Sequence, residues 1–115
     1  MERKPLKVGD IIASRYTYGD ECLFYEYFRV TKVYGDCEKV RLQKLAKYTK
    51  YLTPPPYYYN SPHVSWPVLS TDADEKPILR KVHFDSYGIP TVRTSDYYQS
   101  YSVWTGEALE EYNLH

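Results

Sequence analysis

The chain has 115 residues, a length that predicts one domain able to bury a modest core without disulfides or metals. Its 15 basic and 15 acidic residues give a formal net charge of +0, which excludes the basic excess of a dedicated duplex-DNA binder. A hydrophobic content of 43% and an aromatic content of 17% exclude a disordered chain. Because 15 residues are Tyr, which favours strands and contact surfaces, we expect a single β-rich domain over residues 1–115.

The balanced total hides an uneven distribution of charge along the chain. Residues 1–51 carry 11 Lys and Arg against 7 Asp and Glu, net +4, and residues 52–115 carry 4 against 8, net −4. Because the two halves of one compact domain fold together, we interpret this asymmetry as internal charge complementarity.

Strands are predicted in the first half by β-branched and aromatic residues between turn signals, over residues 11–18, 23–34 and 39–45. The segment 23–34 is apolar on both faces, which is typical of a central strand or of a long bent strand in a curled sheet. Residues 46–52 fit either a continued strand or a helical stripe. We favour strand, because the segment follows a tight turn and has no N-cap before Lys39.

The second half begins with a proline-rich loop over residues 53–62, which we expect to project from the sheet. Further strands are predicted over residues 65–70, 78–85, 89–95 and 98–104. Thr105 can cap a short final helix over residues 106–112. The expected fold is mainly β, a small antiparallel curled sheet or barrel of about six or seven strands with a short C-terminal helix. Its expected core is Phe24, Phe28, Val30, Val82, Val92 and Trp104.

Residues with the spacing of a catalytic, cofactor or metal site are not found, so we expect no enzyme and no cofactor. The three His residues have no zinc-type spacing, and the five Gly residues form no phosphate-binding run. Asp72, Asp74 and Glu75 lack the Gly and the distal Glu of a calcium loop, which favours a polar turn. Cys22 and Cys37 lie near the two ends of one predicted strand, so we expect free thiols and a cytoplasmic location. No apolar run predicts a membrane span.

Two clusters of tyrosines are the candidate partner-binding residues. They are Tyr57, Tyr58 and Tyr59 in the proline-rich loop, and Tyr97, Tyr98 and Tyr101 near the C-terminus. Tyr rings on a stiff loop offer contact area at low entropic cost. The alternative is that these rings pair across strands and cover the core. Pro54 to Tyr57 also matches the Pro-Pro-x-Tyr ligand of WW domains, a short motif that often occurs by chance.

The chain resembles a family of small uncharacterised proteins of bacteriophages and bacterial mobile elements. The resemblance rests on Val8-Gly9-Asp10-Ile11 and Phe24-Tyr25 near the start, and on Lys81-Val82, Gly88-Ile89-Pro90 and Trp104-Thr105-Gly106 near the end. It spans most of the chain and departs from the family pattern at residues 46–64. The resemblance implies a phage or mobile-element origin and no known chemistry.

The sequence thus predicts a non-enzymatic protein that binds a macromolecule, with a host protein as the favoured partner. By analogy with small phage proteins, the partner is a host defence protein that the chain inhibits. One alternative is a single-strand nucleic-acid binder that combines Tyr rings with Lys39, Arg41, Lys44, Lys47 and Lys50. Another is a self-assembling structural or virion-associated protein. The oligomeric state is left open.

Overall fold

The computed structural model describes residues 3–18, 21–56, 61–95 and 99–113, without the side chains of residues 99–102. The described chain consists of strands and connections, and none of its residues is helical. The strands are β1 (Ile11–Tyr18), β2 (Cys22–Tyr34), β3 (Lys39–Tyr51), β4 (His63–Asp72), β5 (Ile78–Phe84), β6 (Pro90–Val92), β7 (Gln99–Val103) and β8 (Leu109–Asn113). The expected mainly β class is therefore confirmed.

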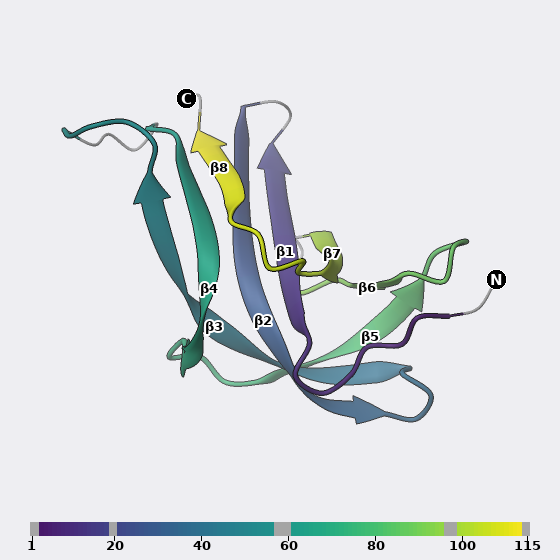
Figure 1. Ribbon diagram of the computed structural model, residues 1–115. Coiled ribbons are helices and arrows are strands. Elements are labelled where there is room, and N and C mark those ends of the chain that lie inside the picture. Colours follow the sequence, from purple (N-terminus) through teal and green to yellow (C-terminus); the bar gives the residue numbers. More distant parts are fainter. Residues whose placement is uncertain (1–2, 19–20, 57–60, 96–98, 114–115) are drawn as a thin grey trace.

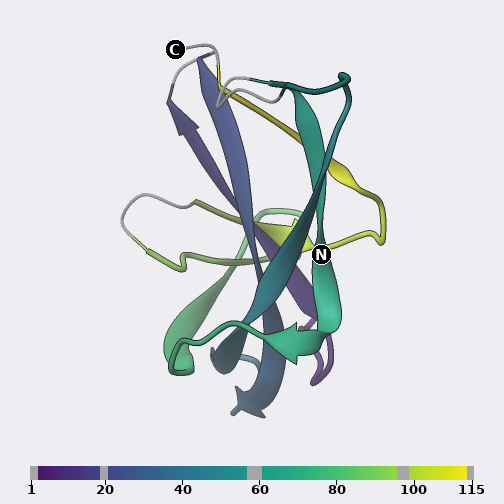
Figure 2. The ribbon, with the colours of Figure 1, turned by 90° about the vertical axis from the view of Figure 1, so that its left-hand side faces the viewer.

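A small closed barrel forms the centre of the fold. The strands follow the order β6-β5-β3-β4-β8-β2-β1-β7, and an additional β2–β3 pairing closes β2, β3, β4 and β8 on themselves. Every pairing is antiparallel. Figure 1 shows β2 and β3 running from the barrel into a hairpin that turns aside next to β5. Figure 2 views the barrel from the side of β3 and β4.

The two longest strands hold the barrel and the outlying strands together. β2 pairs with β1 along its first part, with β8 at Cys22 and Leu23, and with β3 from Phe28 onward. β3 pairs with β2 and β5 in its first half and with β4 in its second half. Register shifts in both strands allow this change of partner, because a bulge bends and twists a strand. The expectation of a long bent strand is confirmed, and residues 46–51 continue as strand.

The predicted C-terminal helix over residues 106–112 is wrong. Residues 109–113 form β8, which lies between β2 and β4 and pairs Leu23 with Tyr112 and His63 with Glu111. Thr105 and Glu107 are local signals for a helix start, but a helix of two turns is marginal by itself. The pairing of β8 with both β2 and β4 outweighs this weak local preference for a helix, because it covers two strand edges and closes the barrel.

The core has two parts, one beside the hairpin and one in the barrel. The first contains Phe28, Val30, Leu42, Val82 and Val92, and the second contains Tyr27, Leu45 and Ala13. The prediction of buried Phe28, Val30, Val82 and Val92 is confirmed.

Phe24 and Trp104, by contrast, are only partly buried. Phe24 lies near the Tyr18–Cys22 end of the β1–β2 hairpin and stacks on its cross-strand partner Tyr16. Trp104 follows β7, meets the ring of Tyr27 edge-on at 6.1 Å and donates its indole N–H to the Glu107 carbonyl. Tyr27, with 0% of its surface exposed, has the central position instead.

The charge asymmetry along the sequence is matched by ion pairs in space. Arg29 binds Asp72 at 2.9 Å, Lys44 binds Glu75 at 3.3 Å, and Lys47 binds Glu111 at 3.0 Å. Each of these pairs joins a base from the first half of the chain to an acid from the second half. This agrees with internal charge complementarity. Asp72 is the last residue of β4 and Glu75 lies in the connection after it, and both carboxylates are bound by basic side chains. Cys22 and Cys37 are buried free thiols.

Two leucines, one on β3 and one on the neighbouring β5, should differ in how much they contribute to stability, because they differ in burial. Leu42 is 0% exposed, whereas Leu79, on the strand paired with β3, is 51% exposed. We expect Leu42→Ala to lower the free energy of unfolding by about 2–5 kcal/mol, because it opens a cavity. Leu79→Ala should change it by less than about 0.5 kcal/mol. Urea denaturation of both variants measures the difference, and equal midpoints would show that Leu42 is not part of the core.

Candidate functional site

Most of the tyrosines predicted to bind a partner lie outside the described residues. This applies to Tyr57, Tyr58 and Tyr59 in the loop and to Tyr97 and Tyr98 before β7. Tyr101 belongs to β7, but its side chain is not described. The contact role of all these residues stays a prediction.

The described part of the proline-rich loop is exposed. It continues from the end of β3, and each residue from Tyr51 to Pro56 is classed as solvent-exposed. The Leu52 N–H donates to the Pro62 carbonyl at 3.0 Å, which fixes the base of the loop. In Figure 1 the segment after β3 extends beyond the strands of the barrel. This agrees with the expected projection for the residues that the structure describes.

An aromatic pair lies on the outer surface of the barrel below this loop. Tyr48 of β3 and Trp66 of β4 are direct cross-strand partners, and their ring centroids are 4.7 Å apart. Tyr48 is 54% exposed and Trp66 is partly buried. Side chains alternate between the two sides of a strand, so Lys47 and Ser65, the neighbours of this pair, point into the barrel. We call Tyr48, Val64 and Trp66 the aromatic face; the exposed residues 51–56 follow it along the chain.

The side chain of Glu111 lies inside the barrel, behind the aromatic face, and is 1% exposed. Its carboxylate accepts hydrogen bonds from the Ser65 hydroxyl at 2.8 Å and from the Tyr25 backbone N–H at 2.9 Å. The Lys47 ammonium lies 3.1 and 3.0 Å from the two carboxylate oxygens, and His63 Nε2 lies 3.0 Å from Oε1. A buried charge is tolerated only with such partners, so this network compensates for the burial of Glu111.

His63 is held between two acceptors. Its Nε2 faces Glu111, and its Nδ1 lies 3.0 Å from the Ser61 carbonyl oxygen. The ring therefore links the Ser61 backbone to the buried carboxylate of Glu111.

The Tyr27 hydroxyl extends the network toward the barrel core. It lies 3.1 Å from the Ser65 carbonyl oxygen, to which it donates, and 2.9 Å from the Ser65 hydroxyl. Burial away from water raises the pKa of Tyr27 to about 12, and the negative charge of Glu111 acts in the same direction. The phenol therefore stays neutral over a wide pH range.

Two lysines of the basic stretch form ion pairs with carboxylates of the same chain. Lys47 donates to the Tyr25 carbonyl at 3.0 Å in addition to Glu111. Lys44 bridges Glu26 at 3.1 Å and Glu75 at 3.3 Å. Burial opposes the charged form of Lys44, but the hydrogen bonds and charges of Glu26 and Glu75 outweigh it and raise the pKa of the ammonium. Both lysines lie in the part of β3 where its pairing changes from β2 to β4.

The network combines residue types that also occur in catalytic sites, and its Ser65 and Glu111 members are buried. Ser65 is 0% exposed and Glu111 is 1% exposed, and their hydrogen bonds are used within the network. Its evident effect is to hold β2, β3, β4 and β8 in one register. Among the described residues, no group of three or more His, Cys, Asp or Glu side chains could hold a metal ion.

Neither the aromatic pair nor the Glu111 network was predicted from the sequence. Tyr48 and Trp66 become neighbours only through the β3–β4 register. The segment Leu109-Glu110-Glu111-Tyr112-Asn113 does not alternate apolar with polar residues, so its pattern held no signal that Glu111 points inward.

Comparison with models of protein families, with curated proteins and with solved structures finds no match. Within the described ranges, no helix is long and apolar enough to cross a membrane.

The Glu111 carboxylate is predicted to be the main polar contribution to barrel stability. Glu111→Ala leaves the Lys47 ammonium and the His63 ring without their acceptor, so we expect a loss of about 3–5 kcal/mol in the free energy of unfolding. The neighbouring Glu110 is exposed, and Glu110→Ala should cost less than about 0.5 kcal/mol. Chemical denaturation compares the variants. Equal stability of the two would refute this role of Glu111.

The raised pKa of Tyr27 predicts that the protein loses stability at alkaline pH. Its native pKa of about 12 lies above the unfolded value of about 10, so its contribution is complete below pH 10 and is lost as the pH rises to about 12. Tyr27→Phe removes this titration. The difference in unfolding free energy between wild type and Tyr27→Phe should be constant up to about pH 9.5 and should then fall. A difference that stays constant to pH 12 would contradict the raised pKa.

Proposed function

We propose that this chain is a non-enzymatic protein-binding domain and that the aromatic face is its contact surface. The observation that carries the proposal is the cross-strand pair of Tyr48 and Trp66, with ring centroids 4.7 Å apart and Tyr48 54% exposed. Tyr and Trp are the residues that most often dominate the energy of protein interfaces. The exposed, proline-rich segment of residues 51–56 begins three residues after Tyr48 in the chain.

The aromatic face has a rigid support, which lowers the entropic cost of binding. Lys47 and Ser65 are the chain neighbours of Tyr48 and Trp66, and both are bound to the buried Glu111. The backbone under the rings is thereby fixed before a partner arrives. Further apolar exposure comes from Leu52, which is 54% exposed and follows β3.

A protein partner is favoured over single-stranded nucleic acid by the state of the lysines. A nucleic-acid surface needs cations free to meet phosphates. Two of the five cations of the basic stretch, Lys44 and Lys47, are instead paired with Glu26, Glu75 and Glu111. The acidic Glu110 also lies beside Val64 at the edge of the aromatic face. Self-assembly through the same rings is the remaining alternative, and a mass that depends on concentration would identify it.

The narrower proposal is that the partner is a host protein, most plausibly a defence protein that the chain inhibits in the host cytoplasm. This part rests on the resemblance to phage and mobile-element proteins and on the small size of the chain. Inhibition by occlusion requires only a stable contact surface, which is consistent with the absence of a catalytic motif in the sequence.

The test is affinity capture from bacterial lysate, followed by measurement of the dissociation constant for the partner that is identified. We expect the double variant Tyr48→Ser, Trp66→Thr to weaken binding by more than about tenfold, since hot-spot aromatics contribute upward of about 2 kcal/mol. Tyr87→Ser is the matched control. Tyr87 is 65% exposed, but it lies in the β5–β6 turn and not on the aromatic face. Circular dichroism should show that all variants retain the fold.

The loop tyrosines provide a second arm of the same experiment. Replacement of Tyr57, Tyr58 and Tyr59 together by Ser should weaken binding to a similar extent and leave the urea midpoint unchanged. A partner that binds both sets of variants as tightly as wild type would refute the proposed surface. Binding that falls steeply with salt and is lost on nuclease treatment would favour the nucleic-acid alternative instead.

A further inference from the structure

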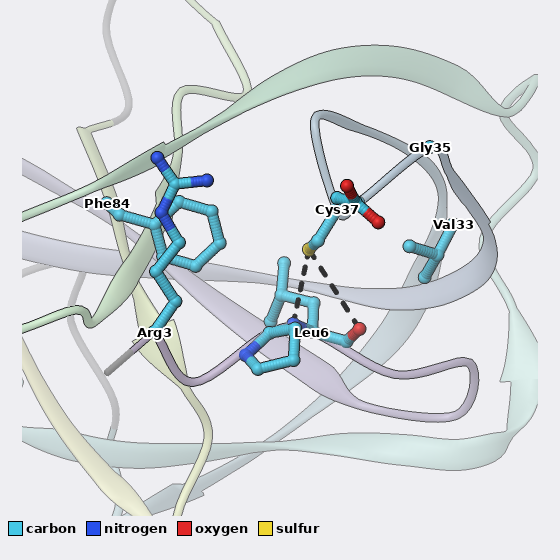
Figure 3. A pocket seen from close by; sticks show the side chains of 8 residues that line it. Arg3, Leu6, Val33, Gly35, Cys37 and Phe84 are labelled. Atoms are coloured by element: carbon cyan, nitrogen blue, oxygen red, sulfur yellow. Dashed lines mark hydrogen bonds between the residues drawn. The ribbon is translucent and has the colours of Figure 1, made fainter.

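A hollow with mixed apolar and charged walls lies beside the turn of the β2–β3 hairpin, away from the aromatic face. Its main chamber has a volume of about 540 Å³ and is lined by Arg3, Pro5, Leu6, Val33, Gly35, Asp36, Cys37 and Phe84. Figure 3 shows Arg3 and Phe84 on one side, Val33 and Gly35 on the other, and Leu6 and Cys37 between them. Leu6 and Cys37 are 4% and 2% exposed, so the floor is part of the core.

Hydrogen bonds hold the wall that the N-terminal segment contributes. The Lys4 N–H donates to the Gly88 carbonyl at 2.9 Å, and the Leu6 N–H donates to Cys37 Sγ at 3.3 Å. The Gly9 N–H donates to the Val30 carbonyl at 2.8 Å. These bonds tie residues 4–9 to the β5–β6 turn and to β2. The hollow is therefore a built feature of the fold rather than a gap beside a loose end.

Arg3 is presented in a way that suits an oxyanion. Its guanidinium carbon lies 4.6 Å from the centroid of the Phe84 ring, over the ring face. Stacking on an aromatic ring leaves the N–H groups at the edge of the guanidinium free to bind a carboxylate or phosphate with two hydrogen bonds. Among the described residues, the Arg3 side chain has no hydrogen bond and no ion pair.

A second chamber of about 370 Å³ adjoins the first and shares Arg3, Cys37 and Phe84 with it. It adds Glu38, Lys81 and His83 to the lining. Asp36 lies in the hairpin turn between Gly35 and Cys37 and lines the main chamber. The cationic residues Lys81 and His83 belong to β5, as does Phe84, whereas the acidic residues Asp36 and Glu38 belong to the hairpin turn.

We propose that this hollow binds a small organic anion. The ligand has a carboxylate or phosphate group that meets Arg3 and Lys81, and a compact apolar body that packs on Leu6, Val33 and Phe84. The apolar floor excludes inorganic anions as good ligands, because they would leave it unfilled. The position of Asp36 fixes the direction of the ligand, because an oxyanion placed at the hairpin side would face a like charge.

The experiment is a titration of the ¹⁵N-labelled full chain, followed by nuclear magnetic resonance. The probes are phenyl phosphate and 3-phenylpropionate, with inorganic phosphate and the neutral 3-phenylpropanol as controls. We expect at least one aryl anion to shift the amides of Leu6, Cys37 and Phe84, with a dissociation constant of about 1 mM or tighter for so few atoms. The ratio between the two aryl anions then shows whether phosphate or carboxylate is preferred. Both controls should bind at least about tenfold more weakly.

Two opposite charge changes sharpen the test. Arg3→Gln should weaken binding of the aryl anion at least about tenfold, because it removes the charged donor. Asp36→Asn should tighten binding of the same anion, because it removes a like charge from the lining. Lys50→Gln, a charge change on the far half of β3, should have no effect.

Four outcomes would overturn the proposal. The first is equal binding of inorganic phosphate and phenyl phosphate, which would mean an adventitious ion only. The second is that the shifts are confined to other amides, and the third is that no binding is saturable. The fourth is unchanged affinity in both Arg3→Gln and Asp36→Asn.

Discussion

The burial of a single carboxylate determines how this small barrel closes. Glu111 lies on β8, and its partners come from β2, β3 and β4, so all strands of the closed barrel meet at one charge. A shift of β8 by one residue would turn Glu111 to the outside and put Glu110 or Tyr112 in its place. Lys47 and His63 would then lose the acceptor that they share. The network thus specifies the register as well as contributing to stability.

Fixing the register also determines what the outer surface presents. Because inner and outer side chains alternate, the inward position of Lys47 and Ser65 requires Tyr48 and Trp66 to face outward. The same register makes the two rings direct neighbours. An exposed aromatic pair on a well-ordered sheet is therefore a consequence of the polar interior. It is not an isolated feature of two surface residues.

Local pattern was enough to predict most strands but not the way they assemble. The run from β1 to β3 was predictable, because Val, Ile, Phe and Tyr alternate there between short turns. β8 was missed, because Thr105 and Glu107 are helix signals that act within a few residues, whereas its pairing with β2 spans most of the chain. Glu111 binds His63, which is 48 positions away in the sequence, and Lys47, which is 64 positions away. No spacing rule covers such separations. Likewise, the partial exposure of Trp104 depends on where β7 places it against Tyr27.

The division of charge along the chain coincides with a division in the structure. The change of sign falls in the stretch of residues 51–71, which carries no Lys, Arg, Asp or Glu and includes the exposed proline-rich loop. The pairs Arg29–Asp72, Lys44–Glu75 and Lys47–Glu111 all cross this stretch. Exposed loop tips are where a protease cuts most readily. A chain nicked in this loop consists of two fragments of opposite charge, each holding strands that the other needs to complete the barrel. Such fragments attract each other before they pack, so the protein is naturally arranged for reassembly from two pieces, most readily at low ionic strength.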